Sequence, residues 1–186
     1  MRKVVEGLKT CHWQVVLALV YTGLALTTLE YFYLPPRVQA RLGGTGTVSL
    51  EAGITWASAT IILLMVVPAL IVRFVHREPL KSIGWGTRGF SRHVLLYLGI
   101  FALVVPFILF AATQKDFLRM YPFVREGTRD WTVFWIWESF YLLQFMAVEA
   151  FFRGYLLFTM EKAMGWHSIF AMAVPCCMIH YHKPYL

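Results

Sequence analysis

"AGITWASATIILLMVVPALIV", residues 52 to 72, is a long apolar run without a single charged side chain. A helix of about 20 apolar residues is long enough to cross the hydrocarbon core of a bilayer. Helices are the expected form, because each unpaired backbone group in lipid costs several kcal/mol and a helix pairs its groups internally. Hydrophobic residues make up 59% of the chain and charged residues 15%, whereas soluble domains average about 25% charged. The sequence therefore predicts an all-α membrane protein.

Similar runs lie on both sides of this segment. The apolar runs cover residues 13–34, 52–72, 94–114, 131–160 and 165–186. Pro35 and Pro36 end the first run, Pro106 interrupts the third, and the fourth is longer than a single crossing needs. We expect about five spans, packed as one multi-span transmembrane helical bundle that forms a single integral-membrane domain over residues 1–186.

The charge pattern agrees with a membrane protein and excludes nucleic-acid binding. The formal net charge is +7, but the basic residues lie between the apolar runs and form no continuous stripe, which suits contact with lipid headgroups. The N-terminus and the loop over 73–92 are rich in Lys and Arg, so both are predicted to be cytoplasmic. The N-terminal run lacks a small-residue cleavage site, which indicates a retained first span. We expect a multi-pass protein of the cell membrane, the inner membrane if the source is bacterial, with membrane lipid as a partner.

The stretch "MAVEAFFRGYLLF", residues 146 to 158, carries two charges inside the fourth run. Glu149 and Arg153 are four residues apart, so on a helix they share a face and can pair. Glu138 precedes Glu149 by three helical turns and lies on nearly the same face. A charge at the centre of a bilayer costs about 2.5–3.5 kcal/mol, and such groups usually face the bundle interior or a water-filled cavity. We expect this stripe to face inward, either as a structural ion pair or as a carboxylate that activates water.

The fifth run supplies a second candidate group, His180. It follows Cys176 and Cys177, and Pro175 can bend the helix just before them. A buried histidine can act as an acid, as a base or as a donor to an oxyanion. A Cys-Cys-x-x-His set can bind a soft metal, but only two of its members share a face well. We therefore expect no metal and no cofactor, and we expect the three cysteines, Cys11 included, to be reduced thiols.

The order of these motifs resembles the CAAX protease and bacteriocin-processing (CPBP, or Abi) family of intramembrane proteases. Glu149, Arg153 and Gly154 match the second glutamate, the arginine and the glycine of the family's first motif. His180 matches the histidine of the second motif, in which Cys176 stands in place of the family's phenylalanine. "LKSIGWGTRGFSRHV", residues 80 to 94, is similar to the amphipathic linker before a core helix of the family. The resemblance covers about the second half of the chain.

The resemblance implies an intramembrane endopeptidase that cleaves a membrane-associated or lipidated peptide. Glu149 would polarise a water molecule, and Arg153 would hold and orient that carboxylate. His180 would stabilise the tetrahedral oxyanion or pass a proton to the leaving amine. No cofactor follows from this assignment.

Two departures from the family pattern keep other functions open. Val148 occupies the position of the family's first glutamate, and the chain ends at Leu186 before a third motif. We therefore expect the chain to be the N-terminal part of a larger CPBP-type domain. A non-catalytic membrane scaffold or bacteriocin-immunity relative is one alternative. A proton-coupled transporter that uses Glu138 and Glu149 is another, although no inverted repeat supports it.

Overall fold

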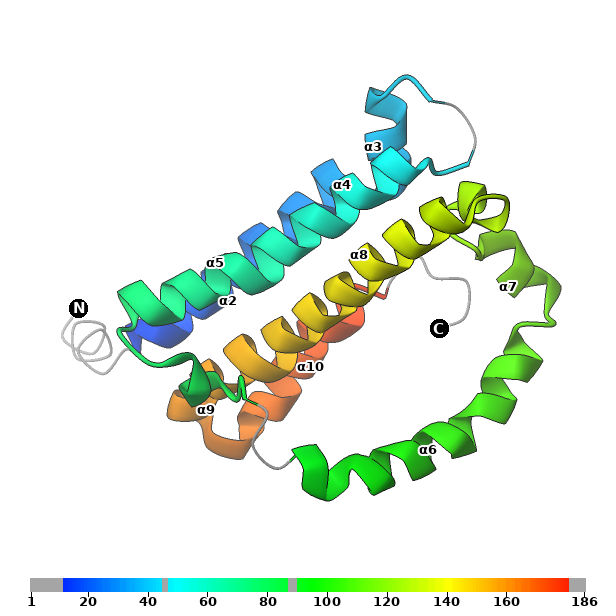
Figure 1. Cartoon of the computed structure of the whole chain (residues 1–186). Coiled ribbons are helices and arrows are strands. Elements are labelled where there is room, and N and C mark those ends of the chain that lie inside the picture. The colour runs from blue at the N-terminus through cyan, green and yellow to red at the C-terminus, as the bar shows by residue number, and fades with distance from the viewer. Residues whose placement is uncertain (1–11, 45–46, 87–89, 181–186) are drawn as a thin grey trace.

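The structure, a computed structural model, describes residues 12–44, 47–86 and 90–180 (Figure 1). Within these ranges the chain forms helices and turns and no β-strand. The basic N-terminal residues that we predicted to be cytoplasmic lie outside the described residues, as do Cys11 and the chain after His180. The prediction of an all-α fold is confirmed.

The first two long helices are each made of several segments that follow one another without a break. The first consists of α2 (Trp13–Thr28) and a π-helical turn, η1 (Leu29–Tyr33). A short helix, α3 (Pro35–Arg41), follows it. The second consists of α4 (Leu50–Ile61), η2 (Ile62–Val66), α5 (Val67–Leu70) and η3 (Ile71–Val75). Ser49 caps this helix, because its hydroxyl oxygen accepts a hydrogen bond of 3.3 Å from the amide of Ala52.

The second half of the chain contains one isolated helix and one helical hairpin. The isolated helix is α6 (Phe90–Ala111), reached through a 3₁₀ turn, η4 (Leu80–Ile83). Two short helices, α7 (Lys115–Met120) and η5 (Arg125–Thr128), lead to the hairpin. Its first arm joins α8 (Trp131–Glu149), η6 (Ala150–Leu156) and α9 (Leu157–Met164). Its second arm, after a turn at η7 (Gly165–His167), is α10 (Ser168–Met178).

Four helical stretches are long and apolar enough to cross a membrane, which places the chain among membrane proteins. They are Trp13–Tyr33, Leu50–Val75, His93–Ala111 and Trp131–Met178. The last stretch includes both arms of the hairpin, because the turn between the arms is itself helical. The second arm has 11 residues, which is about 17 Å at 1.5 Å per residue. The fifth run extends into residues 181–186, which lie outside the described residues, so its separate crossing stays a prediction.

The core lies where the first arm of the hairpin meets the first two helices. Its largest members are Phe151, Phe152, Tyr155 and Leu156, each at most 1% exposed. Next to it, α4 packs closely against α8. A Cβ added at Gly53 would lie 2.7 Å from the ring of Trp137, so only glycine allows the two helices to approach this far.

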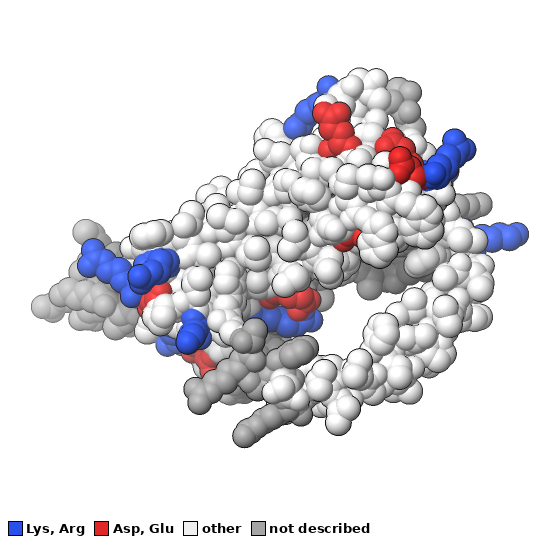
Figure 2. All heavy atoms as spheres, in the orientation of Figure 1, with Lys and Arg blue, Asp and Glu red and all other residues white. Residues whose placement is uncertain are grey.

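Helix α6 stands apart from the bundle. None of the residues in the most apolar stretch of this helix is buried. Side chains such as Leu95 and Phe107 are at least 70% exposed. Figure 1 shows α6 curving away from the other helices, and Figure 2 shows an opening between it and the bundle. Lipid tails are as apolar as these side chains, so an apolar surface in a membrane has no hydrophobic reason to close onto the bundle.

Candidate functional site

Glu149 and Arg153 form an ion pair on the first arm of the hairpin. A guanidinium nitrogen of Arg153 contacts Oε2 of Glu149, so the predicted pairing is confirmed. Their side chains are 54% and 61% exposed. The prediction that the charged stripe faces inward is therefore wrong for this pair.

The neighbours of the pair explain its direction. Phe151, Phe152 and Tyr155 are at most 1% exposed, and each aromatic side chain buries about 150–250 Å². A helix can turn only one face to the core, and burying charges costs several kcal/mol per ion. The face that carries the aromatic rings therefore packs inward, and the ion pair remains exposed.

Val148 occupies a different environment from Glu149. It is partly buried and packs against the core cluster. Neighbouring helical residues point about 100° apart, so Glu149 faces outward while Val148 does not. A carboxylate at position 148 would meet the core, whereas the carboxylate of Glu149 is exposed.

The helix that carries Arg153 is locally widened. Residues Ala150–Leu156 form a π-helix, a geometry that is rare and often found at functional sites. Trp85 stabilises its first turn, because the indole Nε1 donates a hydrogen bond of 3.1 Å to the carbonyl of Ala150. Gly154 lets this segment approach, since a Cβ there would lie under 3.0 Å from the Trp85 indole nitrogen. The beginning of the predicted 80–94 linker thus packs directly on the helix of the ion pair.

His180 lies in the turn after α10 and is half-buried. Its Nδ1 is 3.0 Å from the carbonyl oxygen of Cys176. A carbonyl can only accept, so Nδ1 carries the proton and donates it, which leaves Nε2 as the nitrogen available to another group. The structure thereby assigns the ring a tautomer.

The second arm of the hairpin carries His180 at its end. This arm packs on η6 and α9, with Met172, Cys176 and Ile179 against the core. Among the described residues no hydrogen bond joins the His180 ring to Glu149, and the catalytic roles of the two residues stay a prediction.

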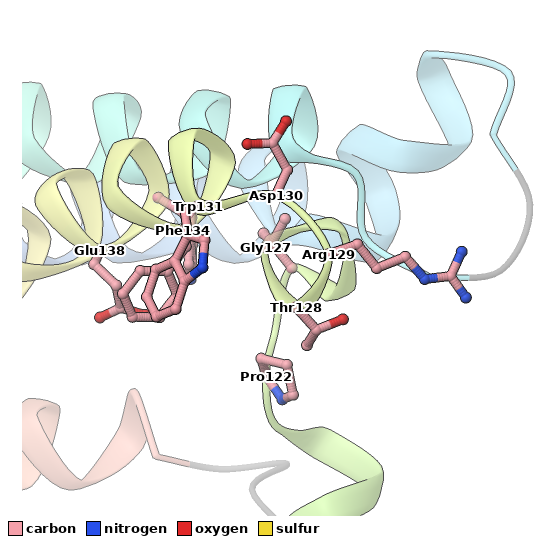
Figure 3. A pocket seen from close by; sticks show the side chains of 10 residues that line it. Pro122, Gly127, Thr128, Arg129, Asp130, Trp131, Phe134 and Glu138 are labelled. Carbon is pink, nitrogen blue, oxygen red and sulfur yellow. The ribbon is translucent and has the colours of Figure 1, made fainter.

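Glu138, the third member of the predicted stripe, has separate surroundings. It lines a pocket at the other end of α8, together with Phe134 and Trp137 (Figure 3). Glu149 does not line this pocket. The two glutamates therefore face different spaces, although sequence spacing put them on nearly one face.

In the described part of the chain, side chains do not gather into a group that could bind a metal ion. No group of three or more His, Cys, Asp or Glu side chains there could hold a metal ion. Cys176 is partly buried and Cys177 is exposed, both as free thiols.

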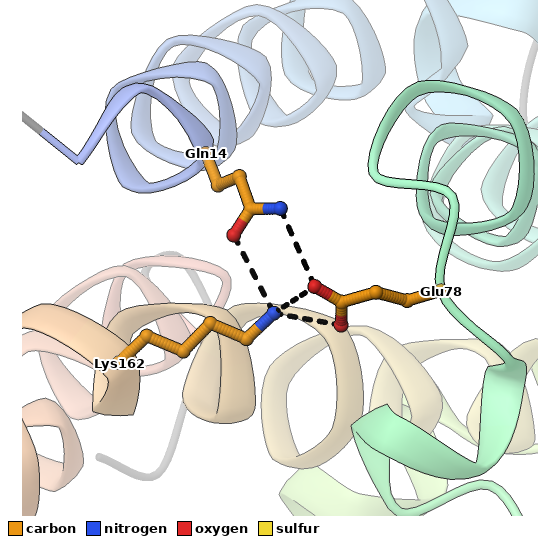
Figure 4. Close-up of polar contacts among 3 residues, drawn as sticks. All are labelled: Gln14, Glu78 and Lys162. Carbon is orange, nitrogen blue, oxygen red and sulfur yellow. Dashed lines mark hydrogen bonds and ion pairs between the residues drawn. The ribbon is translucent and has the colours of Figure 1, made fainter.

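Sequence reasoning missed a polar cluster of Gln14, Glu78 and Lys162 (Figure 4). The Lys162 ammonium lies 2.5 and 2.7 Å from the two carboxylate oxygens of Glu78. Gln14 Nε2 donates to Glu78 Oε1 at 3.3 Å. The hydrogen bond from Lys162 is the main reason that the pKa of Glu78 lies below its usual value. The cluster ties together α2, the segment after η3, and α9, which lie far apart in sequence, so no local pattern could have indicated it.

The Glu78 cluster adjoins a buried histidine. His76 is 8% exposed, its ring is 5.4 Å from that of Trp13, and it stacks on Tyr155 at 6.3 Å. Burial, followed by the nearby Lys162 charge, lowers the pKa of His76 below its usual value. The lowered pKa favours the neutral form of the ring, which packs among aromatic side chains.

No family model, curated protein or solved structure matches this chain.

Proposed function

We propose that the chain is an intramembrane endopeptidase of the CAAX/CPBP type. It cleaves a membrane-associated or lipidated peptide, and Glu149 is its catalytic carboxylate. One observation carries the proposal. The side chains of Glu149 and Arg153 are more than half exposed, so the pair is not sealed in the core. A catalytic carboxylate needs access to water and substrate, and an exposed side chain has that access.

The reaction needs a water molecule, a base and a proton donor. Glu149 takes a proton from water as the water oxygen attacks the scissile carbonyl carbon. Arg153 holds and orients the carboxylate. When the tetrahedral intermediate collapses, the C–N bond breaks and the proton goes to the leaving amine. Nε2 of His180 can carry that proton, because Nδ1 is held by the carbonyl of Cys176.

The depth of Glu149 suits a substrate held in the membrane. It ends a helix of 19 residues, and 15 more residues follow it before the hairpin turn. At 1.5 Å per residue, about 27 Å and 22 Å of helix lie on its two sides. Both lengths are near half of a bilayer with its headgroups, so the carboxylate sits close to mid-membrane. The exposed apolar surface of α6 offers the opposite wall for a lipidated peptide.

A non-catalytic scaffold, such as a bacteriocin-immunity relative, is the second candidate. It is favoured by Val148, which leaves the motif with one carboxylate, and by the direct contact of Arg153 with that carboxylate. The transporter alternative has less support, because Glu138 and Glu149 face different spaces.

Charge removal at Glu149 separates the first two functions. The protein is reconstituted in liposomes, and release of the C-terminal peptide from a farnesylated CAAX-type peptide is followed by mass spectrometry. We expect cleavage by the wild type and a loss of about 10²–10⁴-fold in Glu149→Gln. The matched control is Glu161→Gln, an exposed carboxylate on α9, which should keep full activity.

The same variants must be compared for stability. Glu149 and Arg153 are more than half exposed, so Glu149→Gln should change the free energy of unfolding by less than about 1 kcal/mol. Absence of cleavage by the wild type, or equal cleavage by Glu149→Gln, would contradict the peptidase proposal. A large loss of stability in Glu149→Gln without any wild-type activity would favour the scaffold.

A further inference from the structure

A second site lies at the far end of the bundle, in a pocket between the segment before α8 and the first turns of that helix. The pocket has a volume of about 340 Å³. One wall is aromatic, and the rings of Trp131 and Phe134 lie 5.5 Å apart in an edge-to-face arrangement. The other wall is backbone, because a Cβ at Gly127 would lie 3.3 Å from the backbone of Phe134. The floor is Trp137, which is 3% exposed.

Glu138 supplies the negative charge of this pocket. In Figure 3 its side chain lies beside the rings of Phe134 and Trp131, whereas the side chains of Asp130 and Arg129 point away from them. The Asp130 carboxylate is already used, since it accepts from the amide of Thr132 at 2.7 Å to cap α8. Among the residues whose side chains the structure describes, no hydrogen bond or ion pair engages Glu138.

When the first arm of the hairpin is centred in a bilayer, the pocket lies at the height of the lipid headgroups. The first arm of the hairpin has segments of 19, 7 and 8 residues, which is about 50 Å of helix. The hydrocarbon core is about 30 Å thick, so about 10 Å remains at each end. Glu138 is seven residues beyond Trp131, or about 10 Å along the axis. Its carboxylate is therefore at the boundary between headgroups and hydrocarbon, where a lone charge has lost part of its hydration.

We propose that this pocket binds the ammonium headgroup of a membrane phospholipid, of the ethanolamine or choline type. A carboxylate beside the faces and edges of aromatic rings is the arrangement that attracts an organic cation, by charge and by cation–π interaction. The ammonium group neutralises Glu138, and the acyl chains extend from the pocket into the adjoining hydrocarbon. The height of the site favours a lipid over a soluble amine.

A metal cation fits the same pocket poorly. Ca²⁺ and Mg²⁺ require six or more oxygen ligands. The Asp130 carboxylate caps α8, and the Thr128 hydroxyl donates to the carbonyl of Arg125 at 2.8 Å. Glu138 thus remains as the free anionic group, which suits an ammonium ion better than a divalent metal.

The test is selective lipid retention. The purified protein is incubated in detergent with equal amounts of phosphatidylethanolamine and phosphatidylglycerol of the same chain length, and bound lipid is counted by native mass spectrometry. We expect the wild type to retain about fivefold more phosphatidylethanolamine. Glu138→Gln should lose this preference, and Glu161→Gln should keep it. Trp131→Ala should weaken the preference, whereas Trp135→Ala, an exposed tryptophan outside the pocket, should not.

Two results would overturn the proposal. One is equal retention of the two lipids by the wild type, and the other is a preference that survives in Glu138→Gln. Free ethanolamine is added as a further arm. If it displaces the lipid at matched concentration, the pocket belongs to soluble ammonium ions and the assignment to a lipid headgroup is wrong. Thermal unfolding of each variant shows whether a lost preference reflects the pocket or the fold.

Discussion

Substitution of Gly154 by alanine should destabilise the protein through one specific contact. The new Cβ would lie under 3.0 Å from the indole nitrogen of Trp85 and 3.1 Å from the carbonyl oxygen of Ile83. Real Cβ atoms do not approach other heavy atoms to the first of these distances. Either the tryptophan ring or the π-helical segment must therefore move.

The magnitude follows from two contributions. Forcing a methyl group into packed surroundings costs about 1–3 kcal/mol. Movement of the ring also breaks the 3.1 Å hydrogen bond from Trp85 to the carbonyl of Ala150, which contributes about 1 kcal/mol. We expect Gly154→Ala to lower the free energy of unfolding by about 2–4 kcal/mol. For a chain of this size, this corresponds to a decrease in Tm of about 4–16 °C.

The assay is thermal unfolding in detergent, followed by circular dichroism at 222 nm. The matched controls are Gly23→Ala and Gly99→Ala, because an added Cβ has nothing within 4 Å at either position. Both glycines are in helices, so they share the gain in helix propensity of about 1 kcal/mol. The controls should be as stable as the wild type or slightly more stable.

A double variant tests the contact itself. In a Trp85→Phe background the indole nitrogen is absent, so Gly154→Ala should cost less than half of its single-variant value. The reasoning is refuted if Gly154→Ala unfolds at the temperature of Gly23→Ala. It is also refuted if the loss is unchanged when Trp85 is replaced.

Three further predictions concern polar groups elsewhere in the fold. The pKa of Glu78 is lowered in the folded state, so its pairing with Lys162 stabilises the protein above the unfolded pKa of about 4.3 and is lost as the pH falls through the lower folded value. In denaturant titrations, Glu78→Gln should lower the free energy of unfolding by about 1 kcal/mol at pH 7, a small value because the pair is partly exposed. At about pH 2 the substitution should cost almost nothing. An equal loss at both pH values would contradict this. Gln144→Met should leave the stability in thermal unfolding unchanged or increase it, because Oε1 of Gln144 is buried without a hydrogen-bond partner. Thr60 keeps its hydrogen bond to a backbone carbonyl in this variant. A loss of stability above about 2 kcal/mol would show that the Gln144 amide is satisfied. Asp130→Ala should cost about 1 kcal/mol through loss of the α8 cap, and Asp130→Asn should restore most of that stability.

The helices could be predicted from sequence because each one satisfies its own backbone in lipid. The run at 52–72 became the helix Leu50–Val75, and the run at 13–34 became Trp13–Tyr33 before the two prolines. The i, i+4 pairing of Glu149 with Arg153 was also predictable, since it depends on helical spacing alone. These features are local, and no other part of the chain is needed to specify them.

Only the tertiary structure decided which face of each helix packs against the bundle and which face stays exposed. In a membrane, lipid and protein core are equally apolar, so hydrophobic residues do not reveal which side packs inward. For that reason the sequence did not indicate that α6 stands alone, or that Glu149 is exposed while Val148 meets the core. The Gln14–Glu78–Lys162 cluster joins residues up to 148 positions apart. The sequence by itself determined where the chain is helical and which charges lie in the membrane, and packing decided what those charges face.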